Sequence, residues 1–355
     1  AAACLLAICT ISNAFGVKFF TYVNSTITWA KLGIPLLVIV MFLASRFEPS
    51  NFTAQGGFAP LGLAGVLGAI SSGGIIFSYI GFRHAIDMAG EVKNPGTTIP
   101  VALLLSVLIC FLVYGGLQVA FTGALVPEDL AKGWGGLALP GDFGPLSGMA
   151  AALGLVWMVS VLNVGAVIGP FGGGLVAVGS NARLAFALAE NGFFPKIFTR
   201  ISSLGVPLPA LILNLVFASL AFMLLPFSEV VQLNSAAIVL SFVVGPVAVV
   251  ALRALLPQAN RPLRIPAVKL VALVAFVVCT LIIYWSGWDT IWRLGICLAV
   301  GLVLFLLHAR SHMADGLDTR EAIWLVPYLL GIAVVSYLGA FGGMALVAAM
   351  GGAFL

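Results

Sequence analysis

Four ionisable side chains fall within nine positions of the apolar stretch FSYIGFRHAIDMAGEVKNP (residues 77–95): Arg83, His84, Asp87 and Glu91. If this stretch is helical at its end, Arg83, Asp87 and Glu91 stack on one face, where opposite charges neutralise one another. We therefore predict a structural ion pair between Arg83 and Asp87. A second hypothesis is that Arg83 recognises an anionic substrate, because a guanidinium binds a carboxylate bidentately. His84 can relay a proton, or it can simply bond to neighbouring backbone or water.

The chain that carries these charges has the composition of a membrane protein. It has 355 residues, of which 62% are hydrophobic and 8% are charged, and its mean hydropathy is +1.18. A soluble domain carries about 25% charged residues. Apolar runs of eighteen residues or more recur along the chain, and each can cross about 30 Å of hydrocarbon as a helix. The sequence predicts an all-α, multi-pass integral membrane protein.

Hydropathy and helix breakers predict about ten membrane segments, at residues 1–16, 27–45, 62–90, 99–124, 150–187, 208–226, 230–254, 267–286, 291–308 and 323–341. Two of them, 62–90 and 150–187, are longer than a bilayer requires. They contain the glycine-rich stretches SSGG (71–74) and GAVIGPFGGG (165–174). Both segments are therefore expected to be broken or strongly tilted. The second glycine stretch also suits close packing of helices.

Basic residues are unevenly divided between the two sides of this arrangement. Eleven of the sixteen Lys and Arg residues fall on one side and three on the other, while Lys31 and Arg83 lie inside segments. The positive-inside rule makes the richer side cytoplasmic. The chain has no basic run or patch that would bind nucleic acid. Five cysteines lie in apolar runs without paired spacing, which argues against disulfides and metal ligands: Cys4, Cys9, Cys110, Cys279 and Cys297.

Three motifs, in order along the chain, resemble one family. They are FSYIGF…AGEVKNPGTTIPVALL (77–104), NARLAFALAENGFFPKIF (181–198) and RPLRIP (261–266). They resemble the sixth helix with its following loop, the end of the eighth helix, and the loop before the eleventh helix of the amino acid–polyamine–organocation permeases. The resemblance implies a leucine-transporter-like inverted-repeat bundle with broken helices, in which one set of five helices is related to the next by a pseudo-two-fold axis.

This register divides the chain into three parts. Residues 1–45 are expected to be the end of the first repeat, with its fourth and fifth helices. Residues 62–254 are expected to form the complete second repeat, from the sixth to the tenth helix. Residues 267–355 then supply additional C-terminal helices. The first three helices are expected to be missing, so the chain is interpreted as a partial bundle, truncated at both ends.

The resemblance also implies a substrate site at the broken sixth helix. Carbonyl groups of Ser78, Tyr79, Ile80 and Gly81 are expected to bind the ammonium group of an amino acid, and Phe77 is expected to close over it as an aromatic gate. Carbonyls freed by a helix break carry a partial negative charge, which suits a cation. A plain packing role is the alternative for Phe77.

Lys31, in NSTITWAKLGIPLL, matches a lysine of proton-coupled members of the family. The resemblance implies that it exchanges the coupling proton at the place where related transporters hold sodium. It lies near the start of its expected helix, so snorkelling of its ammonium group to the cytoplasm is the alternative. Arg83 departs from the family pattern, because many members carry an acidic residue after GF. A carboxylate that senses protons is therefore not expected there.

The sequence thus predicts a secondary active transporter of amino acids in the cell membrane, working by proton-coupled symport. Acidic amino acids are the substrates that Arg83 would favour. An amino acid/polyamine exchanger of the same fold is the alternative. A channel would need a repeated filter loop or charged rings, and an intramembrane enzyme would need a nucleophile or metal constellation; neither pattern is present. The expected partners are the amino acid, protons and the lipid bilayer, with no cofactor and an open oligomeric state.

Overall fold

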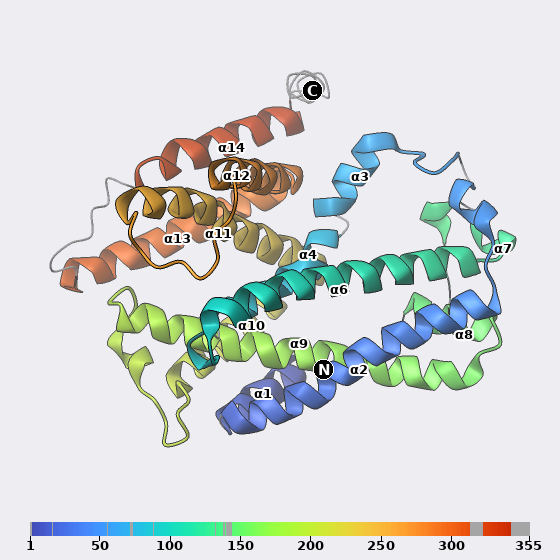
Figure 1. The fold of residues 1–355 in the computed structure, drawn as a ribbon, viewed down its shortest axis with the longest axis horizontal. Coiled ribbons are helices and arrows are strands. Elements are labelled where there is room, and N and C mark those ends of the chain that lie inside the picture. The colour runs from blue at the N-terminus through green and yellow to red at the C-terminus, as the bar shows by residue number, and fades with distance from the viewer. Residues whose placement is uncertain are drawn as a thin grey trace. The chain divides into compact units, whose positions relative to one another are not determined.

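The computed structural model describes residues 2–341, except 16, 55, 72–73, 88, 132, 138, 140–143 and 313–321. These residues form helices, turns and loops without any strand. The α-helices are α1 (Ala2–Ala14), α2 (Val17–Ser45), α3 (Gly62–Ser71), α4 (Ile75–Tyr79), α5 (His84–Asp87), α6 (Pro95–Ala124), α7 (Pro127–Leu130), α8 (Pro145–Ala152), α9 (Val156–Glu190), α10 (Leu208–Leu224), α11 (Phe227–Leu255), α12 (Val268–Trp285), α13 (Trp288–His312) and α14 (Leu325–Phe341) (Figure 1).

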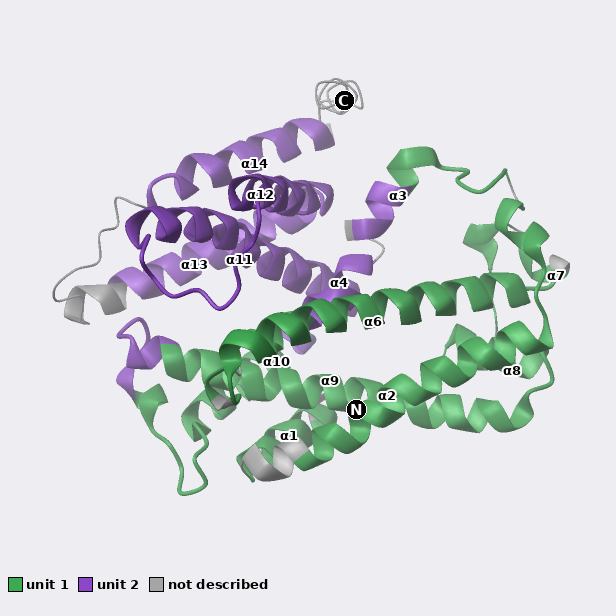
Figure 2. Ribbon diagram, viewed as in Figure 1, with its two compact units in different colours: residues 1–65, 82–187, 197–219 green, residues 66–81, 188–196, 220–355 purple. Residues whose placement is uncertain are grey.

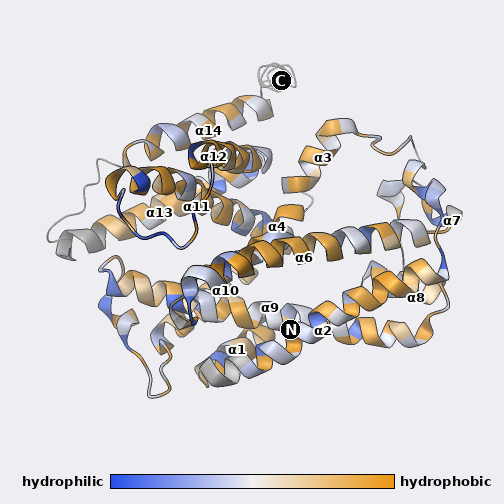
Figure 3. Ribbon diagram, in the orientation of Figure 1, coloured by the Kyte–Doolittle hydropathy of each residue, from blue (hydrophilic) through white to orange (hydrophobic). Residues whose placement is uncertain are grey.

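The long helices have the length and surface of membrane helices. Within the described residues, six can span a bilayer: Tyr22–Ser45, Pro95–Ala124, Val156–Glu190, Phe227–Leu255, Val268–Trp285 and Trp288–Leu306. Hydrophobic residues predominate along these helices (Figure 3), and many large apolar side chains are exposed, among them Leu104 and Leu112 of α6 at 70% and 61%. Such a surface is favourable only in contact with lipid or further protein. The prediction of an all-α multi-pass membrane protein is confirmed.

The chain divides into two compact units (Figure 2). Unit 1 comprises residues 1–65, 82–187 and 197–219, and unit 2 comprises residues 66–81, 188–196 and 220–355. These boundaries follow packing and do not coincide with the expected repeats. The assignment of residues 1–45, 62–254 and 267–355 to repeats and additional helices remains a prediction.

Unit 1 is built around α9, which contributes to two cores. The first core joins α9 to α2, α6 and α8 through the buried side chains of Val38, Phe42, Ala120, Ala124, Met149, Met158 and Leu162. The second joins α9 to α1 and α10 through Cys9, Leu175, Val178, Ala182, Ala210 and Leu211. The amide of Asn13 locks α1 to α9, because its Nδ2 donates to the carbonyl oxygens of Cys9 (3.0 Å) and Leu175 (2.9 Å).

Unit 2 has its own core between α11, α12, α13 and α14, formed by Ala236, Val239, Leu240, Val243, Ile283, Ile291, Leu294 and Ile332. Arg293 of α13 pairs with Glu229 of α11 at 2.9 Å. The RPLRIP motif has a structural role here. Arg261 donates to the carbonyl oxygens of Leu256, of Pro257 (3.2 Å) and of Ala259 (3.1 Å), and so satisfies acceptors that the end of α11 leaves open.

The two overlong segments differ in the structure. Segment 62–90 is broken as predicted: α3 ends at Ser71, Gly74 takes a φ of +82°, and the two halves are bent by 47°. The break predicted within 165–174 is wrong, because α9 runs unbroken from Val156 to Glu190 through Pro170. The interruption lies earlier, between α8 and α9, where Gly154 has a φ of +74°.

Gly172 and Gly174 allow close packing of neighbouring helices and do not break α9. A Cβ on Gly172 would lie 2.7 Å from Lys31 Cε and 2.8 Å from Lys31 Nζ, and one on Gly174 would lie 3.3 Å from Cys9 Sγ. The missing side chains therefore let α2 and α1 approach α9 closely.

The helix break that was expected to free the carbonyl groups of Ser78 to Gly81 does not lie at these residues. Phe77, Ser78 and Tyr79 are in α4, and a 3₁₀ helix continues from Ile80 to Arg83. The break falls one turn earlier because Gly74 adopts the left-handed conformation, which glycine tolerates without a Cβ clash. Ser78 then continues the helix, since its backbone N–H and its Oγ both lie 3.2 Å from the Gly74 carbonyl oxygen.

Candidate functional site

The predicted site residues of the sixth helix fall on both sides of a unit boundary. Phe77 to Gly81 belong to unit 2, whereas Arg83 belongs to unit 1. Within unit 2, Phe77 is 41% exposed and Ile80 is buried. The 3₁₀ helix at Ile80–Arg83 replaces i→i+4 hydrogen bonds by i→i+3 bonds, and such a stretch inside a longer helix often marks a hinge.

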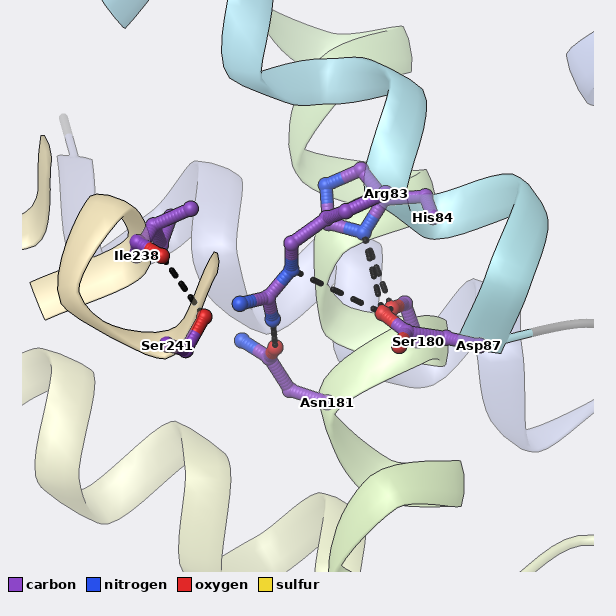
Figure 4. A network of polar contacts seen from close by, with 7 residues as sticks. All are labelled: Arg83, His84, Asp87, Ser180, Asn181, Ile238 and Ser241. Atoms are coloured by element: carbon purple, nitrogen blue, oxygen red, sulfur yellow. Dashed lines mark hydrogen bonds and ion pairs between the residues drawn. The ribbon is translucent and has the colours of Figure 1, made fainter. Parts of the chain in front are cut away.

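Arg83 lies in a polar cluster between α5 and α9 (Figure 4). Its Nε is 3.7 Å from Asp87 Oδ2, and the two side chains are 18% and 16% exposed. That distance allows attraction between the charges but exceeds a hydrogen bond, and Arg83 Nε has no hydrogen-bond partner in the part of the chain that the structure describes. Arg83 Nη2 donates instead to Asn181 Oδ1 at 3.2 Å. The predicted partners Arg83 and Asp87 are therefore neighbours, one helical turn apart.

Ser180 of α9 connects His84 to Asp87. Its hydroxyl donates to Asp87 Oδ2, and its Oγ lies 2.8 Å from His84 Nδ1. Ser180 is fully buried. The histidine thus has side-chain partners, rather than the neighbouring backbone or water that was the alternative from sequence. The predicted stacking with Glu91 cannot be followed, because the Glu91 side chain lies outside the described residues.

Sequence reasoning missed Ser180 and Asn181. Asn181 is the first residue of the motif NARLAFALAENGFFPKIF, which indicated a helix end but no polar role. Ser180 gave no signal at all, since a single serine in an apolar helix is common. Only tertiary packing brings Ser180 to Asp87 and Asn181 to Arg83, each more than ninety positions away along the chain.

Lys31 lies in a different environment, on a cavity of about 250 Å³ within unit 1. The cavity is lined by Ala30, Lys31, Ile34 and Pro35 of α2, Leu146 and Ser147 of α8, and Leu162, Gly165, Ala166, Ile168 and Gly169 of α9. Lys31 is the only charged residue in this lining. It also makes no ion pair or hydrogen bond with any residue that the structure describes.

The start of α2 bears on the snorkelling alternative for Lys31. The helix begins at Val17, ten residues before the predicted start of this segment. Lys31 is therefore about 21 Å from the helix start at 1.5 Å per residue. This position is mid-helix and beside the cavity, and the snorkelling alternative for Lys31 remains a prediction.

These two places offer different chemistry. A lysine at an apolar cavity can bind and release a proton, and an arginine can hold a carboxylate. Among the described residues, no group of three or more His, Cys, Asp or Glu side chains is placed to hold a metal ion.

Comparisons with known proteins agree along nearly the whole chain. A family model described as amino acid permease matches residues 1–335. The glutamate/serine transporter AimA of Bacillus subtilis (strain 168) is 34% identical over 349 residues, which cover 97% of this chain and 64% of that protein. The aspartate-proton symporter of the same organism is 33% identical over 347 residues, which cover 95% of this chain and 66% of that protein. The chain thus spans just under two thirds of the length of these two relatives.

Proposed function

Because this chain belongs to the amino acid permease family, we propose that the protein is a secondary active transporter that moves amino acids across the cell membrane with protons. The main support for this proposal is the match of residues 1–335 to the amino acid permease family. The names of two relatives support its details, since one is a glutamate/serine transporter and the other an aspartate-proton symporter. The apolar exterior of the helices places the protein in a bilayer.

We propose acidic amino acids as the preferred substrates, with Arg83 as the group that binds their side-chain carboxylate. Among the described residues, its Nη2 bonds only to the neutral amide of Asn181, and the carboxylate of Asp87 lies near it without a hydrogen bond. A guanidinium in this state retains the capacity to bind a carboxylate through its planar edge. This arrangement supports an anionic substrate better than a cationic one, which Arg83 would repel.

The amino acid's ammonium group would be bound by backbone carbonyls of Ser78, Tyr79, Ile80 and Gly81, with Phe77 closing over it. The exposed ring of Phe77 supports a gating role. The change from α4 to the 3₁₀ helix supports carbonyl binding, because it alters which carbonyls are bonded within the helix. Phe77→Ala is expected to change uptake kinetics; unchanged kinetics would contradict the gating role.

We further propose that Lys31 exchanges the coupling proton. Three features support this role: its mid-helix position, the adjoining cavity, and the lack of a charged partner among the described residues. An unpaired charge is costly at membrane depth, so an ammonium group there gains by giving up its proton at one stage of a transport cycle.

The test is uptake of labelled aspartate by liposomes that contain the complete protein. A symporter accumulates aspartate when the outside is made acidic, whereas an exchanger requires amino acid or polyamine inside. A channel would equilibrate aspartate without saturation, and an enzyme would convert it. Saturable, gradient-driven accumulation is expected, and unsaturable or absent uptake would contradict the proposal.

A further inference from the structure

The hydroxyl group of Ser180 determines how protons are arranged between His84 and Asp87 (Figure 4). It contacts Asp87 Oδ2 on one side and His84 Nδ1 on the other. A serine hydroxyl has one proton, so it can donate to only one of these neighbours, and the other neighbour must donate to it.

Two arrangements satisfy this requirement. In the first, Asp87 is ionised, Ser180 donates to Asp87 Oδ2, and His84 Nδ1–H donates to Ser180 Oγ. In the second, Asp87 is a carboxylic acid that donates to Ser180 Oγ, and Ser180 donates to His84 Nδ1. An imidazolium in the first arrangement becomes a neutral imidazole in the second when its Nδ1 proton moves to Ser180 and the Ser180 proton moves to Asp87. The number of protons is conserved, and His84 keeps its Nε2 proton.

The three residues form a continuous path of polar contacts in which only the middle one is fully buried. The His84 side chain is 23% exposed and that of Asp87 is 16% exposed, whereas Ser180 is fully buried. A proton can therefore enter at His84 and reach Asp87 through Ser180 without any of the three side chains leaving its partners.

The charge on Arg83 responds to this proton. While Asp87 is ionised, the Arg83 guanidinium has a counter-ion with its Nε at 3.7 Å. When Asp87 is protonated, Arg83 keeps its charge, because guanidinium does not deprotonate in proteins. A cation without a counter-ion is unfavourable inside a membrane, so Arg83 then attracts another anion.

We propose that a proton taken up by His84, Ser180 and Asp87 frees Arg83 to bind the side-chain carboxylate of an acidic amino acid. Proton and substrate then bind together. Protonation of Asp87 leaves Arg83 without its counter-ion, and the substrate carboxylate takes the place of that counter-ion. This inference rests on the proposed function and adds a second group of proton-binding residues to Lys31.

The elements around the cluster carry few other charged groups among the described residues. Arg183 lies one turn beyond Ser180 on α9, beside Gly179. The α6 helix packs against α5 and carries no charged residue. The 3₁₀ turn Ala89–Glu91 also packs against α5, and the side chain of Glu91 lies outside the described residues.

The experiment measures proton uptake during aspartate binding. The complete protein in detergent is titrated with aspartate by calorimetry, in buffers of different ionisation heat and at several pH values. For the wild type we expect Kd to rise about tenfold per pH unit on the alkaline side, as linkage to one proton requires. For Asp87→Asn we expect about one proton less per aspartate and a Kd that no longer follows pH.

Two further variants make the test decisive. Ser180→Ala removes the bridge, and we expect proton uptake to slow about tenfold in stopped-flow measurements with a pH dye. Ser235→Ala is the matched control, because Ser235 is also a buried helix serine but, among the described residues, its hydroxyl bonds only to the Val231 carbonyl of its own helix. It is expected to behave as the wild type.

The outcomes separate this inference from the proposed function. If the wild type binds aspartate but Asp87→Asn retains the full proton uptake and pH dependence, the inference is wrong and the proposed function stands. If Asp87→Asn does not fold, an unchanged uptake rate in Ser180→Ala overturns the inference. If the wild type binds no acidic amino acid at any pH, both the proposed function and the inference fail.

Discussion

Lys31 and Arg83 are both cations within apolar segments of unit 1, yet their surroundings are opposite. Lys31 borders an apolar cavity in which it is the only charged residue. Arg83 lies among the polar side chains of Asp87, His84, Ser180 and Asn181.

The difference follows from the chemistry of the two groups. An ammonium group can become neutral by losing a proton, so a lysine can tolerate an environment without a counter-ion. A guanidinium stays charged, so an arginine at membrane depth needs a partner. In the mechanism we propose, Lys31 itself exchanges a proton, whereas at Arg83 the exchange takes place on the counter-ion, Asp87.

The largest effect is expected for Lys31→Ala. A pH gradient of one unit supports about tenfold accumulation of a substrate coupled to one proton. We expect accumulation in liposomes to disappear in this variant, while pH-dependent aspartate binding at the Arg83 cluster persists. Lys93→Ala is the control, because Lys93 is an exposed lysine in the loop before α6. Accumulation by Lys31→Ala that still followed the gradient would remove the distinction between the two cations.

Arg83→Gln should affect substrate choice. Hydrogen bonds to charged groups contribute about 1.5–3 kcal/mol, so Kd for aspartate is expected to rise at least tenfold. A neutral amino acid such as serine should be affected much less, and it serves as the internal control. Competition assays check the preference: if lysine or arginine displaced bound substrate better than aspartate, Arg83 would not be an anion site.

Gly172→Ala tests the close packing beside Lys31. The added Cβ would lie 2.5 Å from Ile27 Cγ2 and 2.7 Å from Lys31 Cε, so α2 and α9 must separate. Overpacking of this kind costs about 1–3 kcal/mol, measurable as a lower thermal unfolding midpoint in detergent. Gly173→Ala is the matched control, because a Cβ there meets nothing within 4 Å. Equal stability of the two variants would show that α2 does not approach α9 at this glycine.

The smallest effect is expected for Asn181→Ala. The loss of one hydrogen bond to Arg83 is worth about 0.5–1.5 kcal/mol, which corresponds to an increase in aspartate Kd of about two- to tenfold. Asn234→Ala in α11 is the control, since Asn234 is exposed and has no hydrogen bond in the described residues. A larger loss than that of Arg83→Gln would mean that Asn181, rather than Arg83, is the main contact.

Hydropathy alone predicted most of the helices, because each apolar run must satisfy its backbone internally in lipid. The start of α2 was missed because Asn24, Ser25 and Thr26 are polar. The helix continues through them since Thr26 and Thr28 bond to the carbonyl oxygens of Tyr22 (3.1 Å) and Asn24 (2.8 Å) in their own helix. Polarity in a membrane helix therefore does not mark its end when hydroxyl groups find partners one turn back.

The candidate site was predictable only where local spacing sufficed. The i, i+4 spacing of Arg83 and Asp87 indicated their contact. The contribution of Ser180 depends on how α5 packs against α9, which no local pattern encodes. Glycine gave an ambiguous signal: Gly74 breaks a helix through a positive φ, whereas Gly172 lies within an unbroken helix. Both stretches are rich in glycine, so their composition does not tell whether the helix breaks there or packs closely against a neighbour.

The most direct test of proton-coupled transport is to measure proton and aspartate fluxes together in liposomes that contain the complete protein. Aspartate added outside, without any imposed gradient, should carry protons inward and make the external medium more alkaline, at a rate that saturates with aspartate. Saturable aspartate entry without any movement of protons would contradict the proposed coupling.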